Sequence, residues 1–469
     1  MLLTIDSTLK ESLYVQIYEL IKEKIHQKEF KTHEKLPSKR QLAKINNISE
    51  NTVTNAYNQL LVEGYIYSIE RKGYYVSNIE FHSPLLHLED PHHQLKERKI
   101  KKQAFDYDFT RSNPDQKLFP YSIFTKLYRQ LFQEPDNRLI GESDGQGLYP
   151  LRQELQHYLS LSRGVPCSPE QIILGPSSEY LLAILFQLLD EDLHIALENP
   201  GYQGFQALIH RSNLPYSAIS LSENGLNLKE LSESKANLVL VTSNHQFPTG
   251  KIMPLKERQD LLNWANVAPN RYIVENDYDS EFKYSGIPIP SLKYLDQSDR
   301  VIHMASFTRV LSPGIRLAYM VLPDRLVDKY QQLFSTSSSN LSSFEQWILH
   351  DFMAAGHLTS HLNRSRTFYK KKRDQMIQAI KKQDAKAEIY GEKAGLHLLV
   401  EMPFSFDGAF FKKMAAERKI KLKLLSDYSF DLAKDAERFI FLSFSSIPEP
   451  EIEQVIADIF AIAQLAVIK

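Results

Sequence analysis

The chain has 469 residues and a mass of 54.3 kDa, about three times the usual size of one domain, so we expect at least two domains. Its 56 lysines and arginines balance its 57 aspartates and glutamates, which excludes a globally basic nucleic-acid-binding surface. A single cysteine and an apolar content of 43% exclude a disulfide scaffold and a disordered chain. Without a signal-like start or a bilayer-length apolar run, we expect a cytoplasmic protein with no membrane partner.

The first 78 residues have the pattern of a small helical domain with a hairpin. Residues 11–26 carry apolar side chains at helical spacing, which predicts an amphipathic helix. A second helix is expected from the N-cap Ser38 to about Lys44, and a third after the N-cap Ser49. Residues 65–76 predict two short strands with a basic tip. This order is typical of a winged helix-turn-helix.

Local motifs in this segment carry a family resemblance. Leu36-Pro-Ser-Lys-Arg-Gln-Leu-Ala43, Ser49-Glu-Asn-Thr-Val53, Gly64 and Gly73 resemble the head of GntR-type regulators. The resemblance implies that the third helix enters the major groove of a double-stranded DNA operator and that the wing touches the minor groove. It also implies that Arg40 holds a phosphate. The DNA-binding residues expected from it are Arg40, Ser49, Asn51, Thr52, Lys72 and Gly73.

The charges of the first 102 residues bear on how strongly this segment would bind DNA. Residues 1–80 hold 11 Lys and Arg against 10 Asp and Glu, so non-specific DNA affinity should be modest. Glu50 stands where the family usually has an arginine, and therefore the operator sequence cannot be inferred. Five basic residues at positions 96–102 either add a DNA contact or form an ordinary solvated segment. A small helical protein-binding domain is the alternative for the whole head.

From residue 106 onward the predicted secondary structure changes to an α/β pattern. Short β-rich runs alternate with helix-length segments, which predicts a mostly parallel sheet whose ligands bind beyond the carboxyl ends of the strands. After residue 364 the order helix, strand, helix, strand, helix predicts a smaller α+β layer. The expected domains are a winged helix-turn-helix at 1–78, a basic linker at 79–105, a large domain at 106–363 and a small domain at 364–469.

Several motifs at the expected strand ends carry a second resemblance. They include Gly145-Gln-Gly-Leu-Tyr-Pro-Leu-Arg152, Glu198-Asn-Pro-Gly-Tyr202, His245-Gln-Phe-Pro-Thr-Gly250, Glu275-Asn-Asp-Tyr-Asp-Ser-Glu-Phe282 and Leu311-Ser-Pro-Gly-Ile-Arg316. With the head in front, they resemble MocR/GabR regulators, in which a fold type I aminotransferase-like body acts as an effector sensor. The resemblance implies a head-to-tail homodimer.

The residue at the family's cofactor lysine differs. Pyridoxal phosphate chemistry needs a lysine amine, an acid beside the pyridine nitrogen and an anion cup. The family's Ser-Phe-Ser-Lys-Thr-like run reads Ser306-Phe307-Thr308-Arg309-Val310, so the resemblance places Arg309 at the lysine position. A guanidinium stays protonated and cannot form a Schiff base.

Two further positions depart from the family. Asn276 stands where the family's acid pairs with the pyridine nitrogen, and Ser446 stands where its substrate-carboxylate arginine is expected. A one-residue shift would bring in Asp277, but strand alternation turns that side chain to the opposite face. We therefore expect no catalytic residue and no covalently bound cofactor.

Other parts of the family's site are kept. The expected effector-binding residues are Ser177, Tyr202, Asn276, Tyr278, Ser306, Arg309 and Arg316. Among them Ser177, Ser306 and Arg316 match the phosphate cup, while the two tyrosines match partners of the cofactor ring. Pairing of Arg316 with a buried carboxylate and ordinary packing of Tyr202 remain alternatives. Arg309 either binds an anion in the pocket or fills it.

The sequence therefore favours a DNA-binding regulator whose degenerate aminotransferase-like body binds an effector noncovalently and dimerises. The ligand is left open between pyridoxal phosphate and another phosphate or carboxylate, and no metal site is expected. The first alternative is a pyridoxal phosphate-dependent aminotransferase with an N-terminal DNA-binding extension, in which Lys283 or Lys251 would have to reach the cofactor. The second is a scaffold that responds to no ligand.

Overall fold

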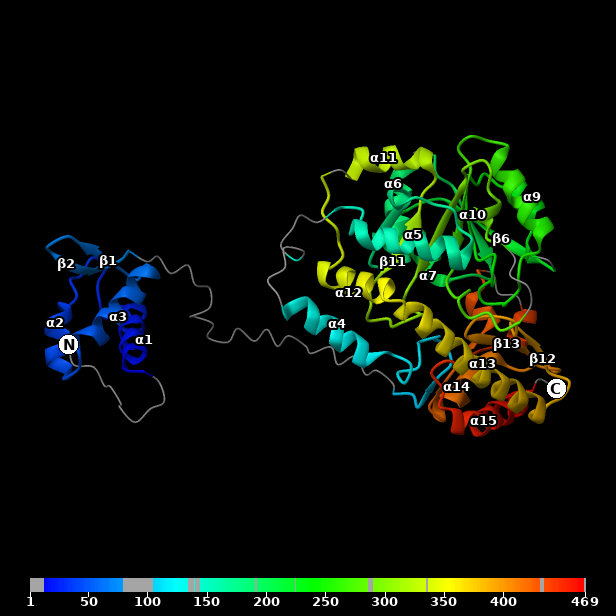
Figure 1. Ribbon diagram of the computed structural model, residues 1–469. Helices are drawn as coiled ribbons and strands as arrows, with labels where there is room; N and C mark the ends of the chain where they lie inside the picture. The colour runs from blue at the N-terminus through cyan, green and yellow to red at the C-terminus, as the bar shows by residue number, and fades with distance from the viewer. Residues whose placement is uncertain are drawn as a thin grey trace. The chain divides into compact units, whose positions relative to one another are not determined.

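The computed structural model describes residues 12–78, 104–133, 139, 144–189, 192–223, 225–285, 290–334, 336–430 and 434–467. The chain divides into two compact units, Met1–Lys101 and Lys102–Lys469, here called the head and the body (Figure 1). The expected linker at 79–105 lies outside the described residues as far as position 103, and with it the basic run at 96–102. In the described part, no helix is both long and apolar enough to cross a membrane.

The head is a winged helix-turn-helix, as the sequence predicts. Its elements are α1 (Leu13–His26), α2 (Lys39–Asn46), α3 (Glu50–Val62) and the antiparallel hairpin of β1 (Ile66–Ile69) and β2 (Gly73–Val76). Ser38 Oγ and Ser49 Oγ cap α2 and α3 by accepting the N–H groups of Gln41 and Thr52. The apolar faces of the three helices meet in one core that includes the fully buried Ile17, Leu42 and Val53.

A large mixed sheet forms the centre of the body. Its strand order is β4-β11-β10-β9-β8-β5-β6-β7. The strands are β4 (Ile172–Gly175), β5 (Ile195–Asn199), β6 (Tyr216–Ser222), β7 (Gly225–Leu226), β8 (Leu238–Val241), β9 (Tyr272–Asn276), β10 (Val301–Ser306) and β11 (Ala318–Val321). Neighbouring strands from β10 to β6 run parallel, while β11 and β7 are antiparallel to their partners.

Both faces of this sheet are buried, because alternate residues of its strands pack on different helices. On β4, Ile172 and Leu174 belong to the same core as Leu151 of α5, whereas Ile173 packs with Leu181 of α6. The surrounding helices are α4 (Tyr121–Gln133), α5 (Tyr149–Arg163), α6 (Ser178–Leu188), α7 (Gln203–Arg211), α8 (Leu228–Glu233), α9 (Leu255–Asn266), α10 (Leu292–Leu295), α11 (Asp324–Phe334) and α12 (Ser343–Ala354). The body thus has the predicted α/β architecture, a mostly parallel sheet with helices on both faces.

The C-terminal layer packs helices on a small antiparallel sheet of order β12-β13-β16-β15 (Figure 1). Its elements are α13 (His357–Gln383), β12 (Glu388–Tyr390), β13 (His397–Glu401), α14 (Gly408–Glu417), β14 (Ile420–Lys421), β15 (Lys423–Leu424), β16 (Phe439–Ser443) and α15 (Ile452–Leu465). A short β3 (Tyr107–Asp108) pairs with β14 and connects the start of the body to this layer. Helix α13 runs through the expected domain boundary at residue 364.

Candidate effector pocket and DNA-binding face

A cavity of about 240 Å³ lies where β4, β5, β8, β9 and β10 end or lead into loops at the same edge of the large sheet. This is the position at which α/β sheets bind ligands. All seven effector-binding residues expected from the sequence line it. They are Ser177, Tyr202, Asn276, Tyr278, Ser306, Arg309 and Arg316. Its volume is below the roughly 300–1,000 Å³ of sites for drug-sized ligands, and therefore suits a small metabolite.

Arg309 reaches into this cavity from the turn after β10. Its guanidinium carbon lies 4.4 Å from the centre of the Tyr278 ring, and its Nη1 lies 3.7 Å from Asp279 Oδ2. Among the described residues, Nη1 is nevertheless buried without a hydrogen bond. Because a cavity remains beside its side chain, Arg309 does not fill the pocket.

The other cation of the pocket is Arg316. In the part of the chain that the structure describes, its side chain is exposed and has no hydrogen-bond or ion-pair partner, so it does not pair with a buried carboxylate. Ser177 caps α6 by accepting the N–H of Tyr180 at 3.1 Å, which places a helix N-terminus at the cavity. Ser306 is the last residue of β10. An arginine, two hydroxyls and a helix N-terminus form a set that binds phosphate or carboxylate.

The aromatic wall combines expected and unexpected residues. Tyr202 is 44% exposed and makes edge contacts with Phe205 and Phe247 at ring-centre distances of 5.0 and 5.9 Å, so its packing is only partial. The Tyr278 hydroxyl lies 3.1 Å from His245 Nδ1. Burial, followed by the nearby Asp279 charge, raises the pKa of Tyr278 well above its ordinary value, so the phenol is neutral.

The sequence analysis missed several lining residues. They are Ser178, Glu179, Phe205, Thr242, Phe247 and Thr308. Thr242 directly follows β8, and Phe247 lies in the motif at residues 245–250 a little further along the chain. Their position after a predicted strand could therefore have indicated that they line the pocket. Glu179 lies 3.4 Å from Arg211 Nη2 on the next helix, a contact that no local pattern indicates.

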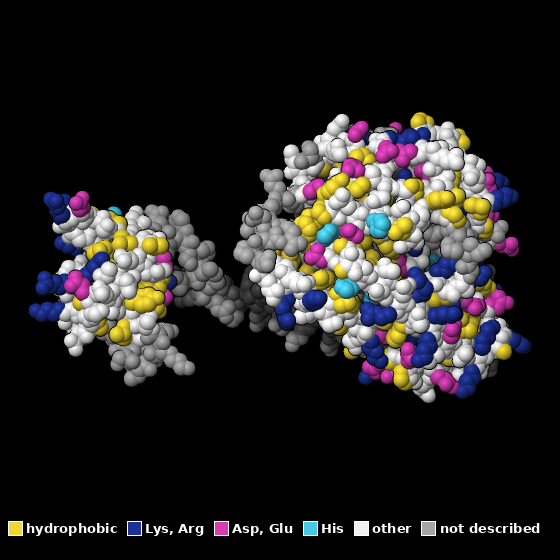
Figure 2. Space-filling model, in the orientation of Figure 1, with side chains coloured by type: hydrophobic (Ala, Val, Ile, Leu, Met, Phe, Trp, Pro, Cys, Tyr) yellow, Lys and Arg dark blue, Asp and Glu magenta, His cyan; other side chains and the backbone are white. Residues whose placement is uncertain are grey.

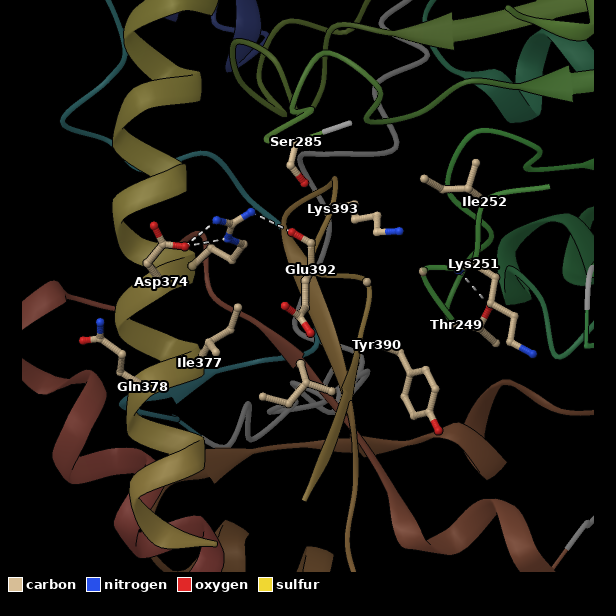
Figure 3. A pocket seen from close by; sticks show the side chains of 14 residues that line it. Thr249, Lys251, Ile252, Ser285, Asp374, Ile377, Gln378, Tyr390, Glu392 and Lys393 are labelled. Atoms are coloured by element: carbon tan, nitrogen blue, oxygen red, sulfur yellow. Dashed lines mark hydrogen bonds and ion pairs between the residues drawn. The ribbon is translucent and has the colours of Figure 1, made fainter. Parts of the chain in front are cut away.

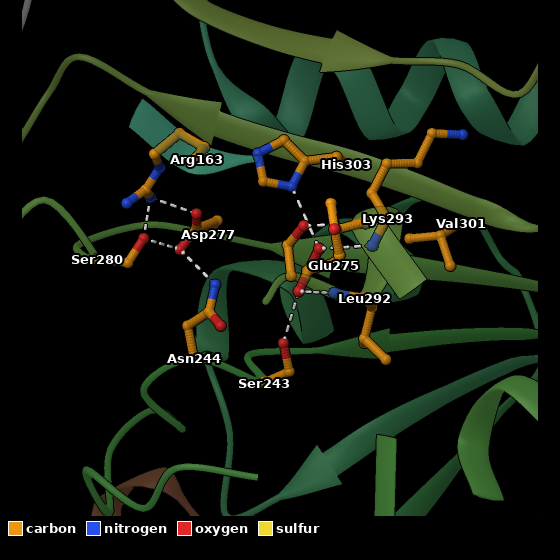
Figure 4. Close-up of polar contacts among 12 residues, drawn as sticks. Arg163, Ser243, Asn244, Glu275, Asp277, Ser280, Leu292, Lys293, Val301 and His303 are labelled. Atoms are coloured by element: carbon orange, nitrogen blue, oxygen red, sulfur yellow. Dashed lines mark hydrogen bonds and ion pairs between the residues drawn. The ribbon is translucent and has the colours of Figure 1, made fainter. Parts of the chain in front are cut away.

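Asp277 points away from the cavity, as strand alternation predicts. It forms an ion pair with Arg163 and accepts a hydrogen bond from Asn244 Nδ2 at 3.1 Å (Figure 4). In the same buried network, Glu275 accepts from Ser243 Oγ at 2.7 Å. Asn276 lines the cavity and Asp277 does not, so no one-residue shift brings Asp277 to the place of the family's acid. Ser446 is exposed and is not among the lining residues.

A buried carboxyl group lies directly behind the pocket. Glu198, on β5, is 6% exposed, and its Oε2 accepts the Thr242 hydroxyl at 2.6 Å and the Thr242 N–H at 3.2 Å. Burial raises the pKa of Glu198 from its ordinary 4.5 to about 7, although these hydrogen bonds oppose the shift. Its carboxyl group therefore titrates near neutral pH.

This titration predicts a pH-dependent stability. Because the folded-state pKa is raised, the contribution of Glu198 is fully present below pH 4.5 and is lost as the pH rises through about 7. The loss levels off at about 3 kcal/mol. We expect Glu198→Gln, which cannot ionise, to gain stability relative to wild type between pH 5 and pH 8. Urea unfolding of both proteins at the two pH values measures the difference, and parallel pH profiles would contradict it.

The head presents a separate polar face. Figure 2 shows basic side chains of the head gathered along the edge of α2 and β2. Arg40, Asn51 and Lys72 are exposed and, among the described residues, make no side-chain hydrogen bond or ion pair. Ser49 and Thr52 also lie at the start of α3, but their hydroxyls are 2.7 Å apart and take part in capping. Gly73 adopts a φ of +113° at the wing, which favours glycine.

Known proteins match both units of the chain. Residues 13–76 match the bacterial regulatory proteins of the gntR family, and residues 130–459 match aminotransferase class I and II. The uncharacterized HTH-type transcriptional regulator YdeL of Bacillus subtilis is 35% identical over 89% of this chain and 90% of its own length. The probable rhizopine catabolism regulatory protein MocR of Rhizobium meliloti is 29% identical over 78% of this chain and 77% of its own. The chain belongs to the MocR-type GntR regulators.

Solved structures agree with this assignment at the level of fold. The body of this MocR-type regulator resembles the kynurenine aminotransferase of Pyrococcus horikoshii with a TM-score of 0.69 and 22% identity. The similarity covers 78% of this chain and 92% of the enzyme. It shows the fold, and an aminotransferase-like fold implies an architecture for pyridoxal phosphate. The pocket of the MocR-type regulator fits the phosphate end of that cofactor, but no lysine is among the described residues that line it.

Proposed function

We propose that this MocR-type regulator binds an anionic effector noncovalently in the 240 Å³ pocket and thereby changes how its heads engage an operator. The observation that carries the proposal is that Arg309 and Arg316 line one cavity, while no lysine is among its described lining residues. An arginine binds phosphate or carboxylate by charge and paired donors, but it does not act as an amine nucleophile. Pyridoxal phosphate held without a covalent bond and a different phosphate or carboxylate both satisfy this chemistry.

Aminotransferase activity is disfavoured by the same geometry. Lys251 and Lys283, the lysines that an enzyme would have to use, line two other cavities. Asn276 offers an amide where pyridoxal catalysis needs an acid. We therefore propose that the body is a sensor rather than an enzyme. We also propose that the chain forms a head-to-tail homodimer, on the basis of its family.

Effector binding can be tested with pyridoxal phosphate and inorganic phosphate as probes. Ligand at about 100 times its Kd stabilises the folded state by about 2.7 kcal/mol, which raises Tm by several degrees. We expect such a shift for wild type with at least one probe, and its loss in Arg316→Gln because the cup loses its unpaired cation.

Arg129→Gln is the matched control, since it removes an exposed arginine of α4 that is not among the residues lining the pocket. Its Tm should rise with ligand as in wild type. An equal shift in Arg316→Gln would show that the probe binds elsewhere. Amino-acid turnover with added pyridoxal phosphate, abolished by a single lysine substitution, would favour the enzyme instead.

A further inference from the structure

Two buried histidines meet at a junction inside the body, outside the effector pocket. His245 lies on the loop that follows β8, and His397 begins β13 of the small sheet. Their ring centres are 4.9 Å apart, and they are 2% and 0% exposed. Asp279, 1% exposed, completes a cluster in which one ligand atom of each residue lies within 4.8 Å of the others.

The hydrogen bonds of the cluster fix where each ring carries its proton. His245 Nδ1 lies 3.0 Å from Asp279 Oδ2 and 3.1 Å from the Tyr278 hydroxyl. A lone pair on Nδ1 would face the carboxylate, which can only accept, so Nδ1–H donates to Asp279 and the Tyr278 O–H does not donate to this nitrogen. His397 Nε2 lies 3.2 Å from the Pro248 carbonyl oxygen, which can only accept, so Nε2–H donates. The remaining nitrogens, His245 Nε2 and His397 Nδ1, therefore carry lone pairs. Both are buried and have no hydrogen-bond partner in the part of the chain that the structure describes.

This arrangement is the one found around metal-binding histidines. A ligating imidazole usually donates its second N–H to a carboxylate or a backbone carbonyl, which fixes the tautomer and aims the free lone pair. Two unsatisfied lone pairs on rings whose centres are 4.9 Å apart also call for a partner in a buried site. We propose that His245 Nε2 and His397 Nδ1 bind a divalent transition-metal ion, with the Asp279 carboxylate orienting His245. Imidazole ligands suit Zn²⁺, Cu²⁺ and Ni²⁺.

Two glycines lie between this site and a neighbouring cavity of the body. A Cβ atom at Gly250 would lie 3.1 Å from His245 Nε2, and one at Gly391 would lie 3.5 Å from it. Both glycines line the 680 Å³ cavity between α13, β12 and the loop at residues 249–252 (Figure 3). A bound ion would link the loop after β8 to the small sheet, because His245 lies on that loop and His397 on β13.

The ion also competes with Arg309. The Arg309 guanidinium lies 3.7 Å from the Asp279 carboxylate, so a second cation at the histidines weakens this ion pair by repulsion. Because Arg309 lines the effector pocket, metal occupancy is coupled to the conformation of that pocket. The proposal of a metal site rests on the contacts of His245, His397 and Asp279, and it does not depend on the proposed effector.

The test is zinc binding to full-length protein stripped of metal with a chelator. We expect wild type to take up Zn²⁺ in a one-to-one ratio in competition with a chromophoric indicator, and Co²⁺ to give visible d–d bands. His397→Phe, which suits the neighbouring rings of Phe247 and Phe441, should abolish uptake. Asp279→Asn keeps the shape but loses the carboxylate, and should weaken binding about 10- to 100-fold.

A matched control addresses the histidines at positions 82, 87, 92 and 93, which also have metal-binding side chains. A variant with all four replaced by asparagine should bind zinc as wild type does. Loss of uptake in that variant with retention in His397→Phe would mean an adventitious ion only. No uptake by wild type would overturn the proposed metal site. Circular dichroism checks the fold of each variant, and zinc-edge anomalous scattering locates the ion independently of mutation.

Discussion

Replacing Arg309 by lysine should convert a regulator that holds pyridoxal phosphate only noncovalently into one that attaches it covalently. Arg309 reaches into a cavity that keeps an unpaired arginine, Arg316, and a helix N-terminus for the phosphate. A lysine amine in the same place can lose its proton and attack the cofactor aldehyde, which a guanidinium cannot do. We expect wild type to show no new visible absorption band with added cofactor and Arg309→Lys to show one.

Borohydride reduction and mass spectrometry make this result quantitative. A stoichiometric mass increase is expected in Arg309→Lys, on the peptide that contains the substitution. Arg309→Met, which removes the charge without adding an amine, is the control and should show none. Transamination should stay absent because Asn276 lines the pocket where an acid is needed. Covalent attachment to another lysine in wild type would contradict the sensor proposal.

The family resemblance predicted seven of the pocket residues, and the topology of the sheet explains why they lie together. Parallel strands bring their carboxyl ends to one edge of a sheet, so residues 177, 202, 276 and 306 converge once the strands are assigned. The orientation of Asp277 follows from alternation along β9. Neither step needs any knowledge of side-chain packing.

Contacts between distant segments could not be predicted in this way. His245 and His397 belong to different layers of the body and meet only because β13 packs against the loop after β8. Their tautomers depend on Asp279 and on the Pro248 carbonyl, and no local pattern encodes those partners. The sequence analysis accordingly expected no metal site, whereas the packing of these two rings is the basis of the proposed one.

Operator binding by the head should depend on Arg40 and Thr52 in different ways. Arg40 is exposed on α2 with no protein partner among the described residues, so it is available to a phosphate. Arg40→Ala should weaken binding about equally for all DNA sequences and reduce the slope of log K against log salt by about one. Thr52 lies in the first turn of α3, and Thr52→Val should cost about 1–3 kcal/mol and alter base preference if its hydroxyl meets a base edge.

The measurement uses an operator selected from random DNA by the wild-type protein, followed by titrations at several salt concentrations. Lys256→Ala on α9 is the matched control, because it removes one exposed cation from the body. Its salt slope and affinity should equal those of wild type. The capping hydroxyl of Ser49 lies 2.7 Å from that of Thr52, so helix content must be compared as well. Unchanged affinity in both head variants would show that α2 and α3 do not form the DNA interface. Weaker binding by the two head variants, with normal binding by Lys256→Ala, would support an interface on α2 and α3.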